Sequence, residues 1–230
     1  LLKQVSRSFY LSLRVLPPGL RVPVSLAYLL ARAADTIADT PGTDEALRLS
    51  RLAVLRQHVA GDVGAEIDLA AAAATPQERT LLQAMPAALQ LLQRLDQADA
   101  AAVRRVVFTL IDGMRFDLQR FDGATAAAPV ALATLDELDR YTYLVAGCVG
   151  EFWTEMALRH CGGLGHLDAG AMSKHGVDYG KALQLTNVLR DCGDDLAAGR
   201  CYLPLSLMPA AEPGRPVHRV RLRRRRRVRG

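Results

Sequence analysis

Residues 23 to 39 combine an apolar repeat with a narrow polar stripe, and this pattern favours a helix packed against a core. Pro23 suits the first turn, and Pro41-Gly42 follows the end of the segment. At about 100° per residue, the polar side chains fall within an arc of roughly 60°. The stripe consists of Tyr28, Arg32, Asp35 and Asp39, and the opposite side carries Leu26, Leu30, Ala33 and Ile37. The two carboxylates therefore lie one helical turn apart.

A second polar stripe lies far along the chain, on a helix expected from residue 170 or 173 to residue 195. Its members are Gln184, Asn187, Asp191 and Asp195, within an arc of roughly 80°. Two Asp residues four positions apart repel each other, and a cation would remove that repulsion. One such stripe is also typical of an ordinary solvated surface. Two stripes that carry Tyr, Gln and Asn favour a shared cavity whose carboxylates hold Mg²⁺, with Arg32 and Arg190 available to neutralise phosphate.

The rest of the chain is also helical in pattern. Ala and Leu recur, β-branched runs are scarce, and only 5% of residues are aromatic, which favours helix over sheet. No linker rich in Gly or Ser divides the chain. Further helices are expected over 44–60, from Thr75-Pro76 to a division at Pro86, over 99–121, and from a capping box at Thr134 to about residue 161. We therefore expect an all-α fold in a single domain.

Between the two stripes lies a helix that is mostly uncharged, from Tyr141 to Trp153. Gly147 and Gly150 fall in its interior, where each Gly costs up to about 1 kcal/mol relative to Ala. Such a cost is expected where another helix or a ligand approaches the backbone closely. The sequence leaves tight helix packing and a ligand-lined wall equally open.

The net charge of +5 comes from the C-terminal tail. Residues 215 to 230 hold nine Arg and no acid, and without them 20 basic side chains face 24 acidic ones, a charge of −4. Such a tail could bind nucleic acid or anionic lipid, or arise from a shifted reading frame. Because the body is acidic and has no nucleic-acid-binding motif, no nucleic-acid partner is expected.

Five short motifs follow one another from residue 5 to about residue 204. They are Val5-Ser6-Arg7-Ser8-Phe9, Tyr28-x-x-x-Arg32-x-x-Asp35-Thr-Ile-Ala-Asp39, Tyr141-x-Tyr143-x-Val-Ala-Gly147-x-Val-Gly150, Gln184-x-x-Asn187-x-x-Arg190-Asp191-x-x-x-Asp195 and Gly199-Arg200-x-Tyr202-x-Pro204. In this order they resemble the squalene/phytoene synthase family of head-to-head prenyl synthases. Each motif alone is weak, whereas five in order, with two acidic motifs far apart, are specific.

The resemblance implies an isoprenoid synthase fold whose central cavity is roofed by the two acidic motifs. Its Mg²⁺ ions would be bound by Asp35, Asp39, Asp191 and Asp195. The diphosphate and the polar roof would involve Ser6, Arg7, Ser8, Arg32, Gln184, Asn187 and Arg190. The catalytic side chains would be Tyr28, Arg32 and Tyr141, with the two tyrosines near the reacting carbons. The prenyl tunnel would be lined by Val145, Ala146, Val149 and Gly150.

The resemblance also implies a reaction between two prenyl diphosphates, which passes through a cyclopropylcarbinyl diphosphate. Squalene synthases quench the last cation with hydride from NADPH, whereas phytoene and dehydrosqualene synthases lose a proton. Asp35-Thr36 and the motif at residues 5–9 resemble squalene synthases more, so farnesyl diphosphate, Mg²⁺ and NADPH are expected, with squalene as product. The alternatives are a phytoene or dehydrosqualene synthase, and a truncated paralogue that binds prenyl diphosphate without catalysis.

We expect residues 1–209 to form the isoprenoid synthase domain and to end before the family's last helices. Residues 210–230 depart from the family pattern as a tail rich in Pro and Arg. The cysteines form no CxxC pair, and neither a signal peptide nor an apolar run of about 18 residues is visible. These features lead us to expect a cytoplasmic protein, with peripheral membrane contact because the expected product is insoluble in water.

Overall fold

The structure, a computed structural model, describes residues 12–62 and 69–207, and within these ranges the fold is all-α. The Arg-rich tail and the motif at residues 5–9 lie outside the described residues. The main helices are α3 (Pro18–Ala38), α4 (Glu45–Ala60), α5 (Pro76–Gln83), α6 (Met85–Arg94), α7 (Gln97–Arg120), α8 (Leu135–Thr142), α9 (Cys148–His160) and α10 (Ala169–Ala197). The shorter elements are η1 (Leu69–Ala72), η2 (Tyr143–Gly147), η3 (Leu205–Leu207), β1 (Val130–Ala131) and β2 (Arg200–Cys201).

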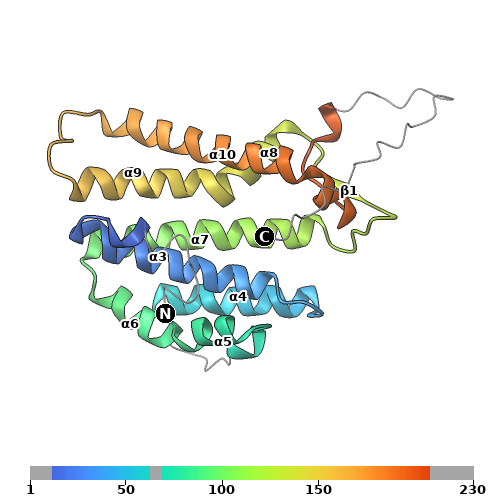
Figure 1. The fold of residues 1–230 in the computed structure, drawn as a ribbon, viewed down its shortest axis with the longest axis horizontal. Helices are drawn as coiled ribbons and strands as arrows, with labels where there is room; N and C mark the ends of the chain where they lie inside the picture. Colours follow the sequence, from blue (N-terminus) through green and yellow to red (C-terminus); the bar gives the residue numbers. More distant parts are fainter. Residues whose placement is uncertain (1–11, 63–68, 208–230) are drawn as a thin grey trace, which may run out of the picture.

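The helices stack in layers, with the α9–α10 pair on one side and α4, α5 and α6 on the other (Figure 1). The helices α3 and α7 lie side by side between them, and both contact α9. Their apolar faces form the main core, whose largest fully buried side chains include Leu30, Ile37, Leu52, Ile111 and Met156. The apolar back that the sequence predicts for α3 is thus in the core.

Helix α3 begins earlier than the sequence predicts. The expected break at Pro17–Gly19 is instead its first turn, with Pro18 among its first positions and Pro23 inside the helix. Pro tolerates the start of a helix because its missing N–H has no partner there in any case. Gly19 is needed in this turn because a Cβ on it would lie 2.9 Å from Nδ1 of His160.

The predicted helix start at Thr75-Pro76 is confirmed by a complete capping box, and the division predicted at Pro86 lies at Ala84, with Pro86 in the first turn of α6. The Thr75 hydroxyl accepts from the backbone N–H of Glu78, whose carboxylate accepts from the backbone N–H of Thr75. At Thr134 only half of the predicted capping box is present. Its hydroxyl accepts from the Glu137 N–H, but the Glu137 carboxylate accepts from the backbone N–H of Ala133.

The helix expected from Thr134 to about residue 161 contains a π-helical turn, η2, between α8 and α9. Such turns widen the helix locally and are frequent at functional sites.

A second difference from the sequence prediction is the pairing of β1 with β2, because a loop is expected at Gly199-Arg200. The two strands are parallel, with Val130 opposite Arg200 and Ala131 opposite Cys201. This contact between distant segments leaves no local signal in the sequence.

Candidate active site

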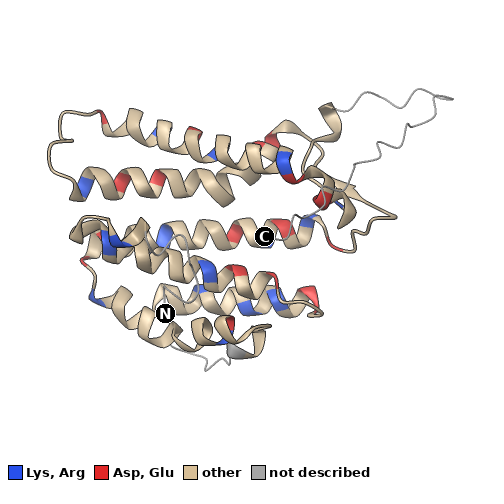
Figure 2. Ribbon diagram, viewed as in Figure 1, with Lys and Arg blue, Asp and Glu red and all other residues tan. Residues whose placement is uncertain are grey.

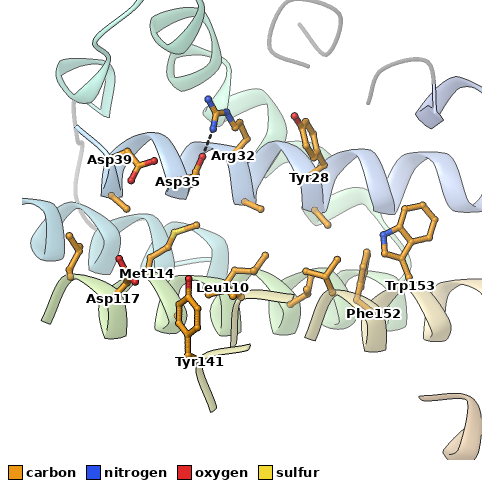
Figure 3. Close-up of a pocket in the computed structure, with 18 of the residues that line it drawn as sticks. Tyr28, Arg32, Asp35, Asp39, Leu110, Met114, Asp117, Tyr141, Phe152 and Trp153 are labelled. Atoms are coloured by element: carbon orange, nitrogen blue, oxygen red, sulfur yellow. Dashed lines mark hydrogen bonds and ion pairs between the residues drawn. The ribbon is translucent and has the colours of Figure 1, made fainter. Parts of the chain in front are cut away.

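A large cavity of about 800 Å³ opens between α3, α7, α8 and α9. Figure 3 shows its two ends: Asp39 and Asp117 lie at one, and Phe152 and Trp153 lie at the other. The first polar stripe of the sequence contributes Tyr28, Arg32, Asp35 and Asp39, which follow one another along α3. The cavity is therefore polar at one end and apolar along the rest of its length.

The polar end gathers three carboxylates, Asp35 and Asp39 from α3 and Asp117 from α7. Burial raises the pKa of Asp35, the neighbouring Asp39 raises it further, and Arg32, which donates a hydrogen bond to Asp35, lowers it in part. Burial likewise raises the pKa of Asp117. The ionised forms of Asp35 and Asp117 are thus disfavoured, and a divalent cation nearby would favour them.

Two stacked tyrosines close the same end of the cavity. The rings of Tyr141 and Tyr202 lie 4.6 Å apart between centroids with an interplanar angle of 24°. The Tyr202 hydroxyl donates to Asp117 over 2.5 Å, and the amide of Gln184 donates to the Tyr141 hydroxyl over 3.3 Å. Burial raises the pKa of Tyr141 to about 12 and also raises that of Tyr202. Both phenols therefore stay protonated near neutral pH.

The apolar part of the cavity is formed by small and medium side chains of α3 and α7, with the larger rings of α9 at its far end. The apolar lining includes Val24, Ala27, Val106, Leu110, Val145, Val149, Phe152 and Trp153. No Lys lines this cavity in the described part of the chain, and its two Arg residues are Arg32 and Arg200. Such an apolar wall is chemically suited to contact with a hydrocarbon chain.

No residue of the second polar stripe lines the cavity, but Gln184 contacts a residue that does. Gln184 contacts Tyr141, and the Asn187 amide donates to Gln184 over 3.2 Å. Burial and then Asp191 raise the pKa of Asp195, while Arg200 lowers it, so Asp195 lies near the polar end. Asp191 instead pairs with Arg190 over 2.7 Å on an exposed surface, and this ion pair lowers its pKa.

The four predicted metal ligands do not converge on one point in the structure. Among the described residues, no three His, Cys, Asp or Glu side chains are close enough together to hold a metal ion. The donor chemistry nevertheless fits Mg²⁺, which binds carboxylate oxygens and keeps several waters. At Asp35 and Asp195, desolvation and a neighbouring Asp outweigh the effect of the nearby Arg, so the pKa of each carboxyl is raised.

Two residues predicted to line the prenyl tunnel lie instead at a helix interface. A Cβ on Gly150 would be 1.9 Å from the carbonyl oxygen of Gly176, and a Cβ on Gly180 would be 2.3 Å from that of Ala146. The missing side chains of Gly150 and Gly180 thus let α10 approach α9 and η2 closely, and Ala146 lies at this contact. Of the two interpretations left open by the sequence, helix packing describes Gly150. Val145 and Val149 line the cavity, while Ser6, Arg7 and Ser8 lie outside the described residues.

Sequence reasoning assigned no role to Asp117, Arg200, Tyr202, Phe152 or Trp153, all of which line the cavity. A signal for Asp117 existed, because it follows Leu110 by seven residues and Gly113 by four on a helix. Arg200 and Tyr202 belong to a motif that was recognised, but their contacts depend on the pairing of β1 with β2.

An all-α fold around an apolar cavity with carboxylates at its end defines the class of the isoprenoid synthases. The sequence model of the squalene/phytoene synthase family matches residues 2–228. The chain therefore belongs to the squalene/phytoene synthase family.

Among its relatives, the presqualene diphosphate synthase of Zymomonas mobilis is 31% identical over 213 residues, which cover 92% of this chain and 60% of that protein. The 15-cis-phytoene synthase of a Synechocystis strain is 29% identical over 88% of this chain and 53% of the relative. The solved complex of the squalene synthase TcSQS with the ligand BPH1237 is 25% identical, with a TM-score of 0.69. That match covers 88% of this chain and 55% of the solved chain. The chain thus spans little more than half the length of these relatives.

Proposed function

We propose that the protein is a Mg²⁺-dependent prenyltransferase that joins two farnesyl diphosphates head to head and carries the product on to squalene. The observation that supports this most is the polarity of the cavity, with Asp35, Asp39 and Asp117 at one end and an apolar wall beyond them. A diphosphate with its cation suits the first part, and a prenyl chain suits the second. The family match and the relatives named above support the coarser part of the proposal, a head-to-head condensation of prenyl diphosphates.

In the first step the C–O bond of one substrate breaks, and its electron pair leaves with the diphosphate. A double bond of the second substrate attacks the allylic cation, and loss of a proton closes the cyclopropane ring. In the second step the cyclopropylcarbinyl diphosphate ionises and rearranges, and hydride from NADPH quenches the final cation. Asp35, Asp39, Asp191 and Asp195 would hold Mg²⁺, which would supply positive charge for the departing diphosphate.

The residues that line the cavity have roles that fit the steps of this reaction. Arg32 is paired with Asp35 in the structure, and a cation bound to Asp35 would release its guanidinium for diphosphate oxygens. Tyr28 and Tyr141 present rings to the reacting carbons, and Tyr141 stays neutral because its pKa is raised to about 12. Val145, Val149 and Phe152 hold the prenyl chain and exclude water, which would otherwise trap the cation.

A second product assignment is favoured by the names of two relatives. The presqualene diphosphate synthases of Zymomonas mobilis and Sinorhizobium fredii are each 31% identical to the chain, over 92% and 86% of its length. An enzyme of that kind would release the cyclopropylcarbinyl diphosphate and would need no NADPH. Phytoene or dehydrosqualene synthesis, also without NADPH, and binding without catalysis are the remaining alternatives.

Incubation of the protein with farnesyl diphosphate and Mg²⁺, with and without NADPH, followed by product identification, separates these functions. Squalene formed only with NADPH supports the proposal. Presqualene diphosphate as the end product in both reactions indicates an enzyme that stops at the first step. A C30 hydrocarbon that ignores NADPH indicates a dehydrosqualene synthase. Tight binding of substrate without any product indicates a non-catalytic paralogue.

Membrane contact would serve an enzyme whose product is insoluble in water. None of the helices in the described ranges is long and apolar enough to cross a bilayer. The candidate segment for contact with an anionic membrane surface is residues 215–230, because they carry nine Arg. Deletion of these residues should weaken binding to anionic vesicles, and unchanged binding would exclude this role.

A further inference from the structure

Asp117 is a partly buried carboxylate with two specific partners. Its side chain is 18% exposed, its Oδ1 accepts from the Tyr202 hydroxyl over 2.5 Å, and its Oδ2 accepts from Nη1 of Arg200 over 3.1 Å. Burying a charged group is unfavourable unless it is paired and hydrogen-bonded. Both oxygens of Asp117 accept a hydrogen bond, which offsets the cost of burying its charge. The same two hydrogen bonds orient the side chains of Arg200 and Tyr202 in the cavity.

The backbone that carries these two side chains is fixed in place. Gly199 has φ of 86°, and a Cβ on it would lie 2.4 Å from the backbone nitrogen of Thr125. The carbonyl of Gly199 accepts from the Val130 N–H over 2.9 Å, in line with the pairing of β1 and β2. Side chains two residues apart in an extended strand point to the same face, which is how Arg200 and Tyr202 both reach Asp117.

Arg200 interacts electrostatically with carboxylates of both acidic motifs. Besides Asp117, the charge of Asp39 from the first motif acts on Arg200, and Arg200 in turn lowers the pKa of Asp195 from the second. Its side chain is 41% exposed, so it is accessible from the mouth of the cavity. A guanidinium carries five N–H donors, and one bond to Asp117 leaves others for an anion. Figure 2 shows acidic residues of α3, α7 and α10 toward the end of the molecule that carries β1.

We propose that Asp117 is a positioning residue, which holds Arg200 between the two acidic motifs and Tyr202 against Tyr141. In this way the polar end of the cavity is assembled before any cation or diphosphate enters. Asp117 acts through Arg200 on the diphosphate, and it does not contact the reacting carbons. This inference rests on the proposed function for the identity of the ligand, but inorganic pyrophosphate can test it without turnover.

The test is the affinity for pyrophosphate in the presence of Mg²⁺, measured by calorimetry on the wild-type protein, Asp117→Asn, Arg200→Gln and the double variant. Hydrogen bonds to charged groups are strong enough that loss of orientation should weaken binding about tenfold in Asp117→Asn. In the Arg200→Gln background the same substitution should have almost no further effect, because the residue through which Asp117 acts is gone.

Two competing roles for Asp117 predict different affinities. If Asp117 acted only as a negative charge, Asp117→Asn would bind the pyrophosphate anion more tightly, and this would overturn the proposal. If it acted only by stabilising the fold, the losses of pyrophosphate affinity in Asp117→Asn and Arg200→Gln would add in the double variant. Additive losses would also overturn the proposal. Absence of pyrophosphate binding by the wild-type protein would also overturn it.

Two further variants keep the result interpretable. Asp112→Asn is a matched control, because Asp112 lies on the same helix, is paired with Arg56 over 3.2 Å, and does not line the cavity. It should bind pyrophosphate like the wild-type protein.

Tyr202→Phe removes one partner of Asp117 and keeps the ring, so it can replace Asp117→Asn as the test variant if Asp117→Asn does not fold. Its binding should weaken less than that of Arg200→Gln, and a greater loss would contradict the assigned role of Arg200. If pyrophosphate binds as expected but farnesyl diphosphate gives no product, the proposed function fails and the positioning role stands.

Discussion

The substitution Gly150→Ala tests the close contact between α9 and α10. A Cβ on Gly150 would lie 1.9 Å from the carbonyl oxygen of Gly176 and 2.6 Å from its carbonyl carbon. Both neighbours are backbone atoms, so no side-chain rotation can relieve the overlap. Because carbon and oxygen normally approach no closer than about 3.3 Å, the two helices would have to separate by more than about 1 Å. At that separation much of the dispersion energy between them is lost.

The expected loss of stability follows from two opposing effects. Overpacking a well-packed interface costs about 1–3 kcal/mol, and more where the backbone itself must move. Ala in place of Gly inside a helix returns up to about 1 kcal/mol. We therefore expect Gly150→Ala to lower the free energy of unfolding by about 2 kcal/mol and Tm by about 4–8 °C. Urea and thermal unfolding followed by circular dichroism at 222 nm measure both quantities.

Gly165→Ala is the matched control, because no heavy atom lies within 4 Å of a Cβ at that position. Its stability should equal or slightly exceed that of the wild-type protein, since Ala restricts the unfolded chain. If Gly150→Ala is as stable as Gly165→Ala, the two helices do not approach as closely as described, and the assignment of Gly150 to helix packing is wrong.

Three further predictions concern the cavity. Tyr141 and Tyr202 have raised pKa values, so the folded state binds their protons more tightly than the unfolded state, whose value is about 10. Stability should therefore fall as pH rises above about 10, through about 12 for Tyr141. Absorbance at 295 nm should show that Tyr141 and Tyr202, and also Tyr143, whose pKa is raised by burial and by Glu151, ionise later than the other tyrosines. Ionisation of all six tyrosines near pH 10 would refute this. Mg²⁺ should raise Tm more at pH 7.5 than at pH 5, because protons compete for Asp35 and Asp195, whose pKa values are raised. An equal shift at both pH values would indicate that Mg²⁺ binds elsewhere. Val149→Phe should narrow the apolar wall and reduce kcat/KM for a C20 substrate at least about tenfold relative to a C15 substrate, and an unchanged ratio would place the prenyl chain away from Val149.

Helical periodicity allowed most of the fold to be predicted. The helices over 44–60 and 99–121, and the division at Pro86, match α4, α7 and the junction of α5 with α6, because these signals are local to each segment. The start of α3 was placed at Pro23, five residues late, since Pro is compatible with the first turn at either Pro18 or Pro23. The pairing of β1 with β2 and the π-helical turn depend on tertiary contacts, which a pattern along one segment does not contain.

The part of the candidate site that lies on one helix was also predictable, because helical periodicity is a signal local to that segment. The stripe from Tyr28 to Asp39 lines the cavity because a 3.6-residue period places its members on one face of one helix. Asp117 was missed because a single Asp on an amphipathic helix is more often solvated, and only its contacts with Arg200 and Tyr202 reveal otherwise. The position of Asp191, paired with Arg190 on the surface, depends on the rotation of α10 about its axis, which spacing does not determine.

Release of pyrophosphate from farnesyl diphosphate in the presence of Mg²⁺, compared among the wild-type protein, Asp35→Asn and Asp112→Asn, tests whether the diphosphate departs in this cavity. Removing a group that stabilises developing charge typically slows catalysis by about 10²–10³-fold. We predict that much loss in Asp35→Asn, with thermal stability equal to or above that of the wild-type protein, because desolvation and the neighbouring Asp39 raise the pKa of this half-buried carboxyl. Asp112→Asn should release pyrophosphate at the wild-type rate. Full turnover by Asp35→Asn, or no release by the wild-type protein, would show that the diphosphate does not depart from the polar end of this cavity.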